Sequence, residues 1–378
     1  MKKNLILLFL FTFITIYPQQ TFRYRELNAD LKAKVAVNPS EIAKIQKSCF
    51  SKAKDLTEFL PKNYDKTGKT DYTAALQKGI NSSNDVMMPD FPVLVNHVGL
   101  QLKSNTKVLF RKNSKLIVKP NDKEFYAALN LENVKNVKVY FANLEGERFQ
   151  HQSTKGEWGM GIYIVHSEDL YFYKPTIKKF WGDGLYIGKL EGKTSKNIEI
   201  DGAFIDENRR NGISIIAGEN VKISNSVIAN TYGTIPEYGI DLEPNKPQDE
   251  LTNINIENTV TYNNSKGGVL FALDNLQGLP SKPVTVKIKN HTDYYSEKGV
   301  EFYADRGYQK FVQPLKGKIT VDGLSLLHNK TPLINNQSQR TGIELILSNI
   351  SANNIKVNSN KLNNFAEKLK TGKEEIIR

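Results

Sequence analysis

Apolar and polar residues alternate in a short phrase that recurs along the middle of the chain. Each copy starts at a glycine, followed by two apolar residues on either side of a variable one. The copies start at Gly161, Gly184, Gly212 and Gly239, with weaker ones at Gly268 and Gly299. By subtraction the glycines are 23, 28, 27, 29 and 31 residues apart, a period typical of chains in which one supersecondary unit stacks on the next. The pattern predicts a solenoid.

Each phrase is interpreted as a strand, because its apolar residues are two apart and it enters from a glycine turn. Further β-like runs begin at Asn197, Asn220 and Asn253. Two or three short strands per coil leave no room for a helix of three turns, so an all-β fold, a parallel β-helix, is favoured over leucine-rich or helical repeats. In stacked coils these asparagines would lie one above another, in turns that their side chains can support.

The N-terminus predicts secretion. Two lysines precede an apolar run over residues 5–17, which is too short to span a bilayer. Residues 1–20 are therefore interpreted as a signal peptide, and the mature protein is expected to be secreted or periplasmic, with no membrane insertion. The single cysteine, Cys49, cannot form an internal disulfide, and we expect it to be buried.

The rest of the chain divides into three parts. Residues 21–62 form a helical preamble of unassigned role, in which a helix starts at Asn38 and continues to Leu60. The β-helix domain covers residues 63–358 and opens with a short amphipathic helix over residues 71–80. The lysine-rich residues 359–378 form a cap or a tail.

The start of the β-helix domain resembles a known family. The helix over residues 71–80 is followed by β-like runs at 86–89, 100–105 and 108–110. This order resembles the pectate-lyase-like superfamily, particularly its rhamnogalacturonase and epimerase-like members. The resemblance covers residues 65–350 and implies a right-handed, single-stranded parallel β-helix whose N-terminal end is plugged by a capping helix. Such a cap is expected on physical grounds, because a bare first coil would expose an unpaired edge and an apolar cross-section.

Register decides which side chains face solvent. If the two apolar residues after each glycine point into the core, the residue between them points outward. These residues form a first outward ladder of Tyr163, Tyr186, Ser214, Asp241, Leu270 and Glu301. A second outward ladder, two residues further on, consists of Val165, Gly188, Ile216, Glu243, Ala272 and Tyr303. Because neighbouring coils are about 4.8 Å apart, side chains of three or four coils would meet over one or two sugar units.

The ladders place carboxylates beside aromatic residues. Asp241 and Glu243 are two apart on one strand, so both are expected to point outward, and Asp183 stands at the entrance of a strand two coils earlier. Cleavage of a glycosidic bond needs one carboxylic acid and one carboxylate, so these three are the candidate catalytic residues. The alternative is that Asp183 is an ordinary turn residue and the other two are surface acids.

Aromatic and basic residues surround these acids. Candidate substrate-binding residues are aromatic side chains suited to stacking on pyranose rings, two arginines that could hold an anionic group or pair with the acids, and a histidine in the loop before the first phrase: Trp158, Tyr163, Trp181, Tyr186, Arg209, Arg210 and His151. The alternative for the aromatic residues is that they only cover the sheet. No compact metal-ligand spacing is present, and no cofactor is expected, although calcium would be possible in a lyase.

The polygalacturonase branch of the superfamily offers a partial match. The sequence Trp-Gly-Asp-Gly at 181–184 resembles one of its aspartate-bearing strand entrances. The next coil has Arg-Asn-Gly at 210–212 where that branch has further acids, and its Gly-His-Gly and Arg-Ile-Lys motifs do not occur. The resemblance therefore supports only Asp183, and Asp241 and Glu243 depend on the register argument.

Charge and length complete the prediction. The chain has 378 residues, a formal charge of +12 and a pI near 9.3, which favours an acidic partner unless the lysines serve only solubility. No run combines basic residues with spaced aromatics as a nucleic-acid surface would. We therefore expect a monomer that acts on an anionic polysaccharide, by hydrolysis. One alternative is a lyase or epimerase on a uronic-acid polymer, in which an arginine and a histidine or tyrosine take the place of the carboxylate pair. The other is a non-catalytic carbohydrate-binding surface protein.

Overall fold

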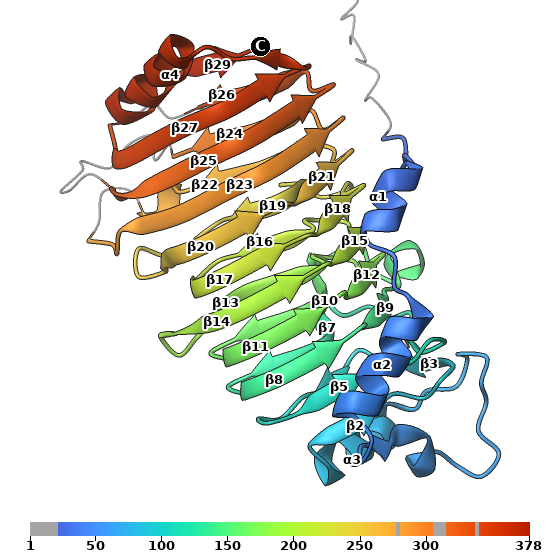
Figure 1. Ribbon diagram of the computed structural model, residues 1–378. Coiled ribbons are helices and arrows are strands. Elements are labelled where there is room, and N and C mark those ends of the chain that lie inside the picture. Colours follow the sequence, from blue (N-terminus) through green and yellow to red (C-terminus); the bar gives the residue numbers. More distant parts are fainter. Residues whose placement is uncertain (1–21, 277–279, 305–314, 337–339) are drawn as a thin grey trace, which may run out of the picture.

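The chain winds into a right-handed parallel β-helix of about nine turns, seen side-on in the computed structural model (Figure 1). The structure describes residues 22–276, 280–304, 315–336 and 340–378. The predicted fold class is confirmed. The predicted signal peptide, residues 1–20, lies outside the described residues.

Each full coil contributes strands to three parallel stacks. The first stack consists of β4 (Leu100–Gln101), β7 (Phe125–Glu132), β10 (Trp158–Val165), β13 (Leu185–Leu190), β16 (Ile213–Ile215), β19 (Tyr238–Leu242), β22 (Gly267–Ala272), β24 (Lys298–Tyr303) and β26 (Thr331–Asn335). The second stack consists of β1 (Lys54–Asp55), β2 (Asp85–Met87), β5 (Lys107–Leu109), β8 (Lys135–Tyr140), β11 (Glu168–Tyr173), β14 (Lys193–Asp201), β17 (Gly218–Ser224), β20 (Leu251–Glu257), β23 (Val284–Tyr294), β25 (Lys316–Leu327) and β27 (Gly342–Ala352). The third stack consists of β3 (Pro92–Val95), β6 (Lys115–Val118), β9 (Asn143–Glu145), β12 (Thr176–Lys178), β15 (Phe204–Asp206), β18 (Val227–Ala229) and β21 (Val260–Tyr262). It continues into the second half of β23, which pairs with β21.

The recurring glycines are required by the close approach of consecutive coils. A Cβ atom at Gly184 would lie 2.7 Å from the carbonyl oxygen of Gly212, and one at Gly212 would lie 2.5 Å from that of Gly239. A side chain at these positions would therefore push the coils apart. The apolar residue after each glycine points into the interior, where Leu185 and Ile213 are directly paired and fully buried. The repeat thus builds one continuous hydrophobic core.

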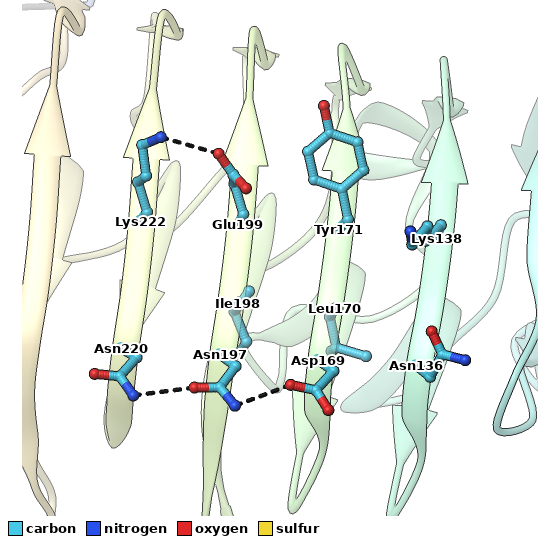
Figure 2. Close-up of a pocket in the computed structure, with 10 residues that line it drawn as sticks. All are labelled: Asn136, Lys138, Asp169, Leu170, Tyr171, Asn197, Ile198, Glu199, Asn220 and Lys222. Carbon is cyan, nitrogen blue, oxygen red and sulfur yellow. Dashed lines mark hydrogen bonds and ion pairs between the residues drawn. The ribbon is translucent and has the colours of Figure 1, made fainter. Parts of the chain in front are cut away.

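A column of asparagines runs along the second stack, as the sequence predicts. The Nδ2 atom of Asn220 donates to Oδ1 of Asn197 at 3.0 Å, and that of Asn253 donates to Oδ1 of Asn220 at 2.8 Å. Figure 2 shows the column continuing to Asp169. All of these residues have positive φ, near 54 to 58°, a left-handed conformation that asparagine and aspartate tolerate better than most residues. The side chains bond to one another from coil to coil and so tie the turns together.

The asparagine column gives a stability prediction. Asn220→Ala removes two side-chain hydrogen bonds. It also leaves alanine in the left-handed region, which alanine tolerates less well than asparagine does. We therefore expect the free energy of unfolding to fall by about 2 kcal/mol. Asn220→Gly removes the same bonds without the backbone cost and should be less destabilising by about 1 kcal/mol. Thermal and urea unfolding of the two variants measures the difference. Equal losses would contradict the backbone part of this account.

The two ends of the solenoid are covered by helices (Figure 1). At the N-terminal end, α3 (Thr73–Ser82) buries Leu76 and Ile80 completely, and this is the capping helix that the sequence predicts, displaced by two residues. The 3-10 helix η1 (Leu56–Phe59) packs against Gly79 of α3. At the C-terminal end, α4 (Ser359–Thr371) buries Phe365 against Phe302. The chain then ends in β29 (Glu375–Ile377), antiparallel to β26, and β28 (Ile355–Lys356) is antiparallel to β27.

The preamble lies along the side of the solenoid as a strap, residues 22–49 (Figure 1). It contains α1 (Ala29–Lys34) and α2 (Pro39–Cys49). Leu31 of α1 packs with Val227 and Val260 of the third stack, and the hydroxyl of Tyr24 donates to Asp206 at 3.3 Å. The strap thus covers apolar side chains on the outside of the third stack.

Two expectations about the preamble are wrong. The predicted helix does not continue to Leu60 but ends at Cys49, because Lys54 and Asp55 leave it to pair as the first strand of the second stack. Cys49 itself is exposed and not buried. It lies on the outer side of α2, whereas the next residue, Phe50, turns inward and is 1% exposed.

Candidate functional site

The first outward ladder has the register that the sequence predicts. Tyr163 pairs with Tyr186, Tyr186 with Ser214, and Ser214 with Asp241. The ladder continues through Leu270 to Glu301. The members of the second outward ladder are mostly covered, since Val165, Ile216 and Ala272 are less than 9% exposed. Gly188 leaves room for the ring of Tyr186, which a Cβ there would approach to 2.7 Å.

The three predicted acids meet around one guanidinium. The Nη1 atom of Arg210 lies 3.2 Å from Oδ2 of Asp183, and its Nη2 atom lies 2.7 Å from Oε2 of Glu243. The Nε atom lies 3.4 Å from Oε2 of Glu157, in the loop before β10. Asp241 is close enough for its charge to act on Arg210. We call Asp183, Asp241, Glu243, Glu157 and Arg210 the acid cluster.

Asn211 fixes the positions of two of these acids. Its backbone N–H donates to Oδ1 of Asp183 at 3.0 Å. Its side-chain Nδ2 donates to Oδ2 of Asp241 at 2.9 Å and to Oγ of Ser214 at 3.0 Å. The Oδ1 atom of Asn211 in turn accepts from the N–H of Tyr238. Because every one of these groups is buried, the network holds the carboxyl groups in defined orientations.

The cluster favours different protonation states for its members. Burial, followed by the charge of Glu243, raises the pKa of Asp241 well above the ordinary value. Burial also raises the pKa of Asp183, an effect that the positive charge of Arg210 opposes. Burial alone would lower the pKa of Arg210, but the charges of Asp183 and Glu243 reverse this and raise it. The Oδ1 atom of Asp241 has no hydrogen-bond partner among the described residues, and a proton shared with Glu243 would satisfy it.

Asp241 is not exposed, contrary to the expectation. It points away from the core, between the inward-facing Ile240 and Leu242, but its own exposure is 0%. The side chains of Arg210 and Glu243 belong to the same cluster and remain 11% and 25% exposed. Asp183 is also fully buried. Of the three predicted acids only Glu243 is accessible from solvent, so the sequence pattern correctly indicates the direction of Asp241 but not its burial.

A strip of aromatic side chains extends from the acid cluster toward the N-terminal coils. The rings of Tyr163 and Tyr186 stack with centroids 5.4 Å apart, and Phe125 meets Tyr163 edge-on at 5.2 Å. Phe125 is paired with Trp158, and both are exposed. Phe125 does not belong to a glycine-led phrase, so the repeat did not indicate it. Its place one coil before Trp158 was the available signal.

The remaining predicted residues form a separate stack beside the cluster. Trp181 lies against His151 with ring centroids 4.1 Å apart, and the guanidinium of Arg209 lies 3.6 Å from the centre of the Trp181 ring. Arg209 also donates to the carbonyl oxygen of Gly156 at 3.0 Å. The side chain of His151 is fully buried and bonds Glu147. These contacts hold the loop before β10, and substrate binding by these three residues stays a prediction that their present contacts do not favour.

Three further findings on the described residues concern metal binding, a surface pocket and membrane insertion. Within residues 22–276, 280–304, 315–336 and 340–378, no three His, Cys, Asp or Glu side chains are arranged to hold a metal ion. A shallow pocket lies on the second stack, away from the acid cluster (Figure 2). Its lining includes Asp169, Asn197 and Asn220 of the asparagine column together with Lys138, Tyr171, Glu199 and Lys222. No described helix combines the length and apolarity needed to cross a membrane.

Comparison with known proteins assigns the chain to a family. The model described as "Right handed beta helix region" matches residues 80–243 and 133–279, which together span just over half of the chain. The chain therefore belongs to the family of right-handed β-helix proteins. The resemblance to the pectate-lyase-like superfamily is confirmed at the level of the fold.

Individual relatives are distant. The chain is 24% identical over 226 residues to the uncharacterized protein YclG of Bacillus subtilis (strain 168), a match that covers 55% of this chain and 38% of that protein. Among solved structures, the A-module of the Azotobacter vinelandii mannuronan C-5 epimerase AlgE6 is similar with a TM-score of 0.57 and 13% identity, over 77% of this chain and 72% of that one. A tailspike double mutant of E. coli bacteriophage HK620, in complex with pentasaccharide, has a TM-score of 0.56 and 10% identity, over 84% and 69%. At these identities the similarity shows the fold alone.

Proposed function

We propose that this protein acts on a polysaccharide outside the cytoplasm, and that it hydrolyses glycosidic bonds at the acid cluster. The observation that carries the proposal is geometric: the buried carboxyl groups of Asp183 and Asp241 and the partly exposed one of Glu243 lie together on one face of the solenoid, beside an aromatic strip. Burial raises the pKa of Asp183 and, more strongly, that of Asp241. Glycoside hydrolysis requires this combination of a carboxylic acid, a carboxylate and a surface on which a sugar can lie.

The roles follow from burial and charge. Asp241 holds a proton and shares it with Glu243, whose partly exposed side chain delivers it to the leaving glycosidic oxygen. Asp183 is the carboxylate that activates water. The water would reach Asp183 beside the Arg210 side chain, which is 11% exposed. Cleavage leaves the proton from water on Asp183 and a hydroxyl group on the sugar; Asp183 then loses its proton to solvent, and Asp241 and Glu243 regain one from solvent.

Two similar folds support a saccharide ligand. One is the A-module of a mannuronan C-5 epimerase, and another is a tailspike protein in complex with a pentasaccharide. The groups that a lyase or epimerase would use as a base are less favourable in this chain. Burial raises the pKa of Tyr186, and the side chain of His151 is fully buried. Hydrolysis is therefore the reaction that the cluster supports best.

The experiment is a screen of the purified protein against soluble neutral and acidic glycans. We expect new reducing ends without the ultraviolet absorbance of a C4=C5 double bond. Reducing ends together with that absorbance would instead identify a lyase. Altered sugar composition without cleavage would identify an epimerase, and binding without any product would identify a carbohydrate-binding protein.

A further inference from the structure

We propose that the acid cluster takes an uncharged stretch of polysaccharide, and that Glu157 is the residue that disfavours sugars bearing a carboxylate. The inference rests on the proposed function, which it makes specific for a substrate class. It departs from the expectation of an anionic substrate, which followed from the formal charge of +12.

The face that carries the cluster is not basic. Register pairs define one column of outward residues along the first stack: Gln101, Asn130, Tyr163, Tyr186, Ser214, Asp241, Leu270, Glu301 and Ile334. This column contains two carboxyl groups and neither lysine nor arginine. The formal charge of the chain is therefore not carried by this column, and the basic residues beside it are Arg210, Lys189 and Lys298.

The cation in the cluster is already engaged. Each of the three guanidinium nitrogens of Arg210 faces a protein carboxylate, at 3.4 Å for Glu157, 3.2 Å for Asp183 and 2.7 Å for Glu243. A bidentate grip on a substrate carboxylate needs two parallel N–H groups that point at the ligand. The Nη1 and Nη2 atoms already donate to Asp183 and Glu243. The Nε atom has no hydrogen-bond partner among the described residues, but one N–H group alone cannot form such a pair.

Neighbouring lysines on this face are engaged in the same way. The Nζ atom of Lys298 lies 2.6 Å from Oε2 of Glu301, and that of Lys189 lies 2.5 Å from Oδ1 of Asp249. A carboxylate on a bound sugar would therefore meet paired cations and the partly exposed oxygens of Glu243 and Glu157. The sugar carboxylate and these glutamate oxygens carry like charges, and their repulsion at contact distance lowers the binding affinity several-fold to many-fold. Sugar hydroxyl groups, in contrast, can donate hydrogen bonds to these oxygens.

Glu157 is held in position by the stack beside the cluster. The carbonyl oxygen of its neighbour Gly156 accepts from Nε1 of Trp181 at 3.1 Å and from Nη1 of Arg209 at 3.0 Å. The Glu157 side chain remains 37% exposed, compared with 25% for Glu243, whereas Asp183 and Asp241 are buried. It is thus an acid at the open edge, where substrate selection takes place.

The test compares one polymer in two charge states. A neutral soluble glycan that the protein binds is oxidised at its C6 hydroxyl groups to carboxylates, and binding of both forms is measured by affinity electrophoresis. We expect the wild-type protein to bind the neutral form about tenfold more tightly. Glu157→Gln should reduce this preference by about threefold to tenfold. Glu199→Gln, which changes an acid paired with Lys222 on the second stack, should leave it unchanged.

The outcomes separate this inference from the proposed function. If the protein binds neutral glycan but does not cleave it, the proposal of hydrolysis is wrong and the proposal of an uncharged substrate is retained. Preferential cleavage of a uronate polymer by the wild-type protein would overturn the substrate class and leave hydrolysis standing. Binding of neither form, or a preference that Glu157→Gln does not change, would also overturn the inference.

Discussion

Asp241→Asn is expected to lower kcat/KM on the best substrate by about 10² to 10⁴-fold, the usual contribution of a general acid. The variant keeps the size of the side chain and can still accept from Nδ2 of Asn211. It removes the carboxyl group whose raised pKa makes Asp241 the source of the proton in the proposed mechanism. We expect folding to be preserved, because the buried aspartate favours its neutral form and an amide is neutral. Steady-state kinetics and thermal unfolding measure the two effects separately.

A matched control exists in the third stack. Asp206 is also buried, burial raises its pKa, and it accepts from Nδ2 of Asn230 at 2.9 Å. Asp206→Asn should therefore change stability to a similar extent but leave kcat/KM within about twofold. If Asp241→Asn kept full activity, or if both variants lost activity equally, Asp241 would have no role in the chemistry.

The pH profile gives a second readout of the same residue. The proposed acid must be protonated to act, and its pKa is raised. Wild-type activity should therefore persist above the ordinary range for aspartate and fall as pH rises through the raised pKa of Asp241. In Asp241→Asn this alkaline limb should move or disappear, which a purely structural role would not produce.

Arg210→Met is expected to give the largest loss of stability of any single change at the cluster. It leaves Asp183, Glu243 and Glu157 without their cation, and removal of one partner from a buried ion pair typically costs about 3–5 kcal/mol. Because a solenoid can unfold in parts, hydrogen exchange in β16 and β19 should report the loss beside the thermal transition. Arg209→Met is the control. Its guanidinium bonds two carbonyl oxygens and stacks on Trp181, so about 1–2 kcal/mol is expected.

Lowering the pH should partly rescue Arg210→Met. Without the guanidinium, the folded-state pKa values of the buried carboxyl groups rise further above their unfolded values, since burial already raises those of Asp183 and Asp241. The folded state then binds more protons than the unfolded state, so stability falls as pH rises through this window and recovers as pH falls. A loss of stability independent of pH would contradict this electrostatic explanation.

The sequence predicted the fold because each coil repeats the same physical requirement. A glycine must lie beneath the carbonyl oxygen of the next glycine, and the residues after it alternate between core and surface. The register of Tyr163, Tyr186 and Asp241 therefore follows from the repeat. The helix from Asn38 was predicted too long for a reason that lies outside the repeat, since its end is set by pairing between Lys54 and Val86.

The candidate site was predicted less completely, because the burial of each acid depends on side chains from other coils. The sequence placed Asp183, Asp241 and Glu243 on one face, and the structure brings all three to Arg210. Glu157 was not predicted, because nothing in the sequence around it indicates contact with Arg210, which lies in the turn before β16, residues 207–212. The use of Asn211 as a bridge between two acids was likewise not visible from spacing.

The sequence by itself determined the period, the strand register and the direction of each ladder residue, because these follow from local alternation and from the 4.8 Å stacking that is general to β-structure. Only the tertiary structure decided which acids are buried, which cation they share and how residues 22–49 lie along the third stack. The physical reason is that direction is set within one strand, whereas burial and charge pairing are set by turns and segments that are far away along the chain.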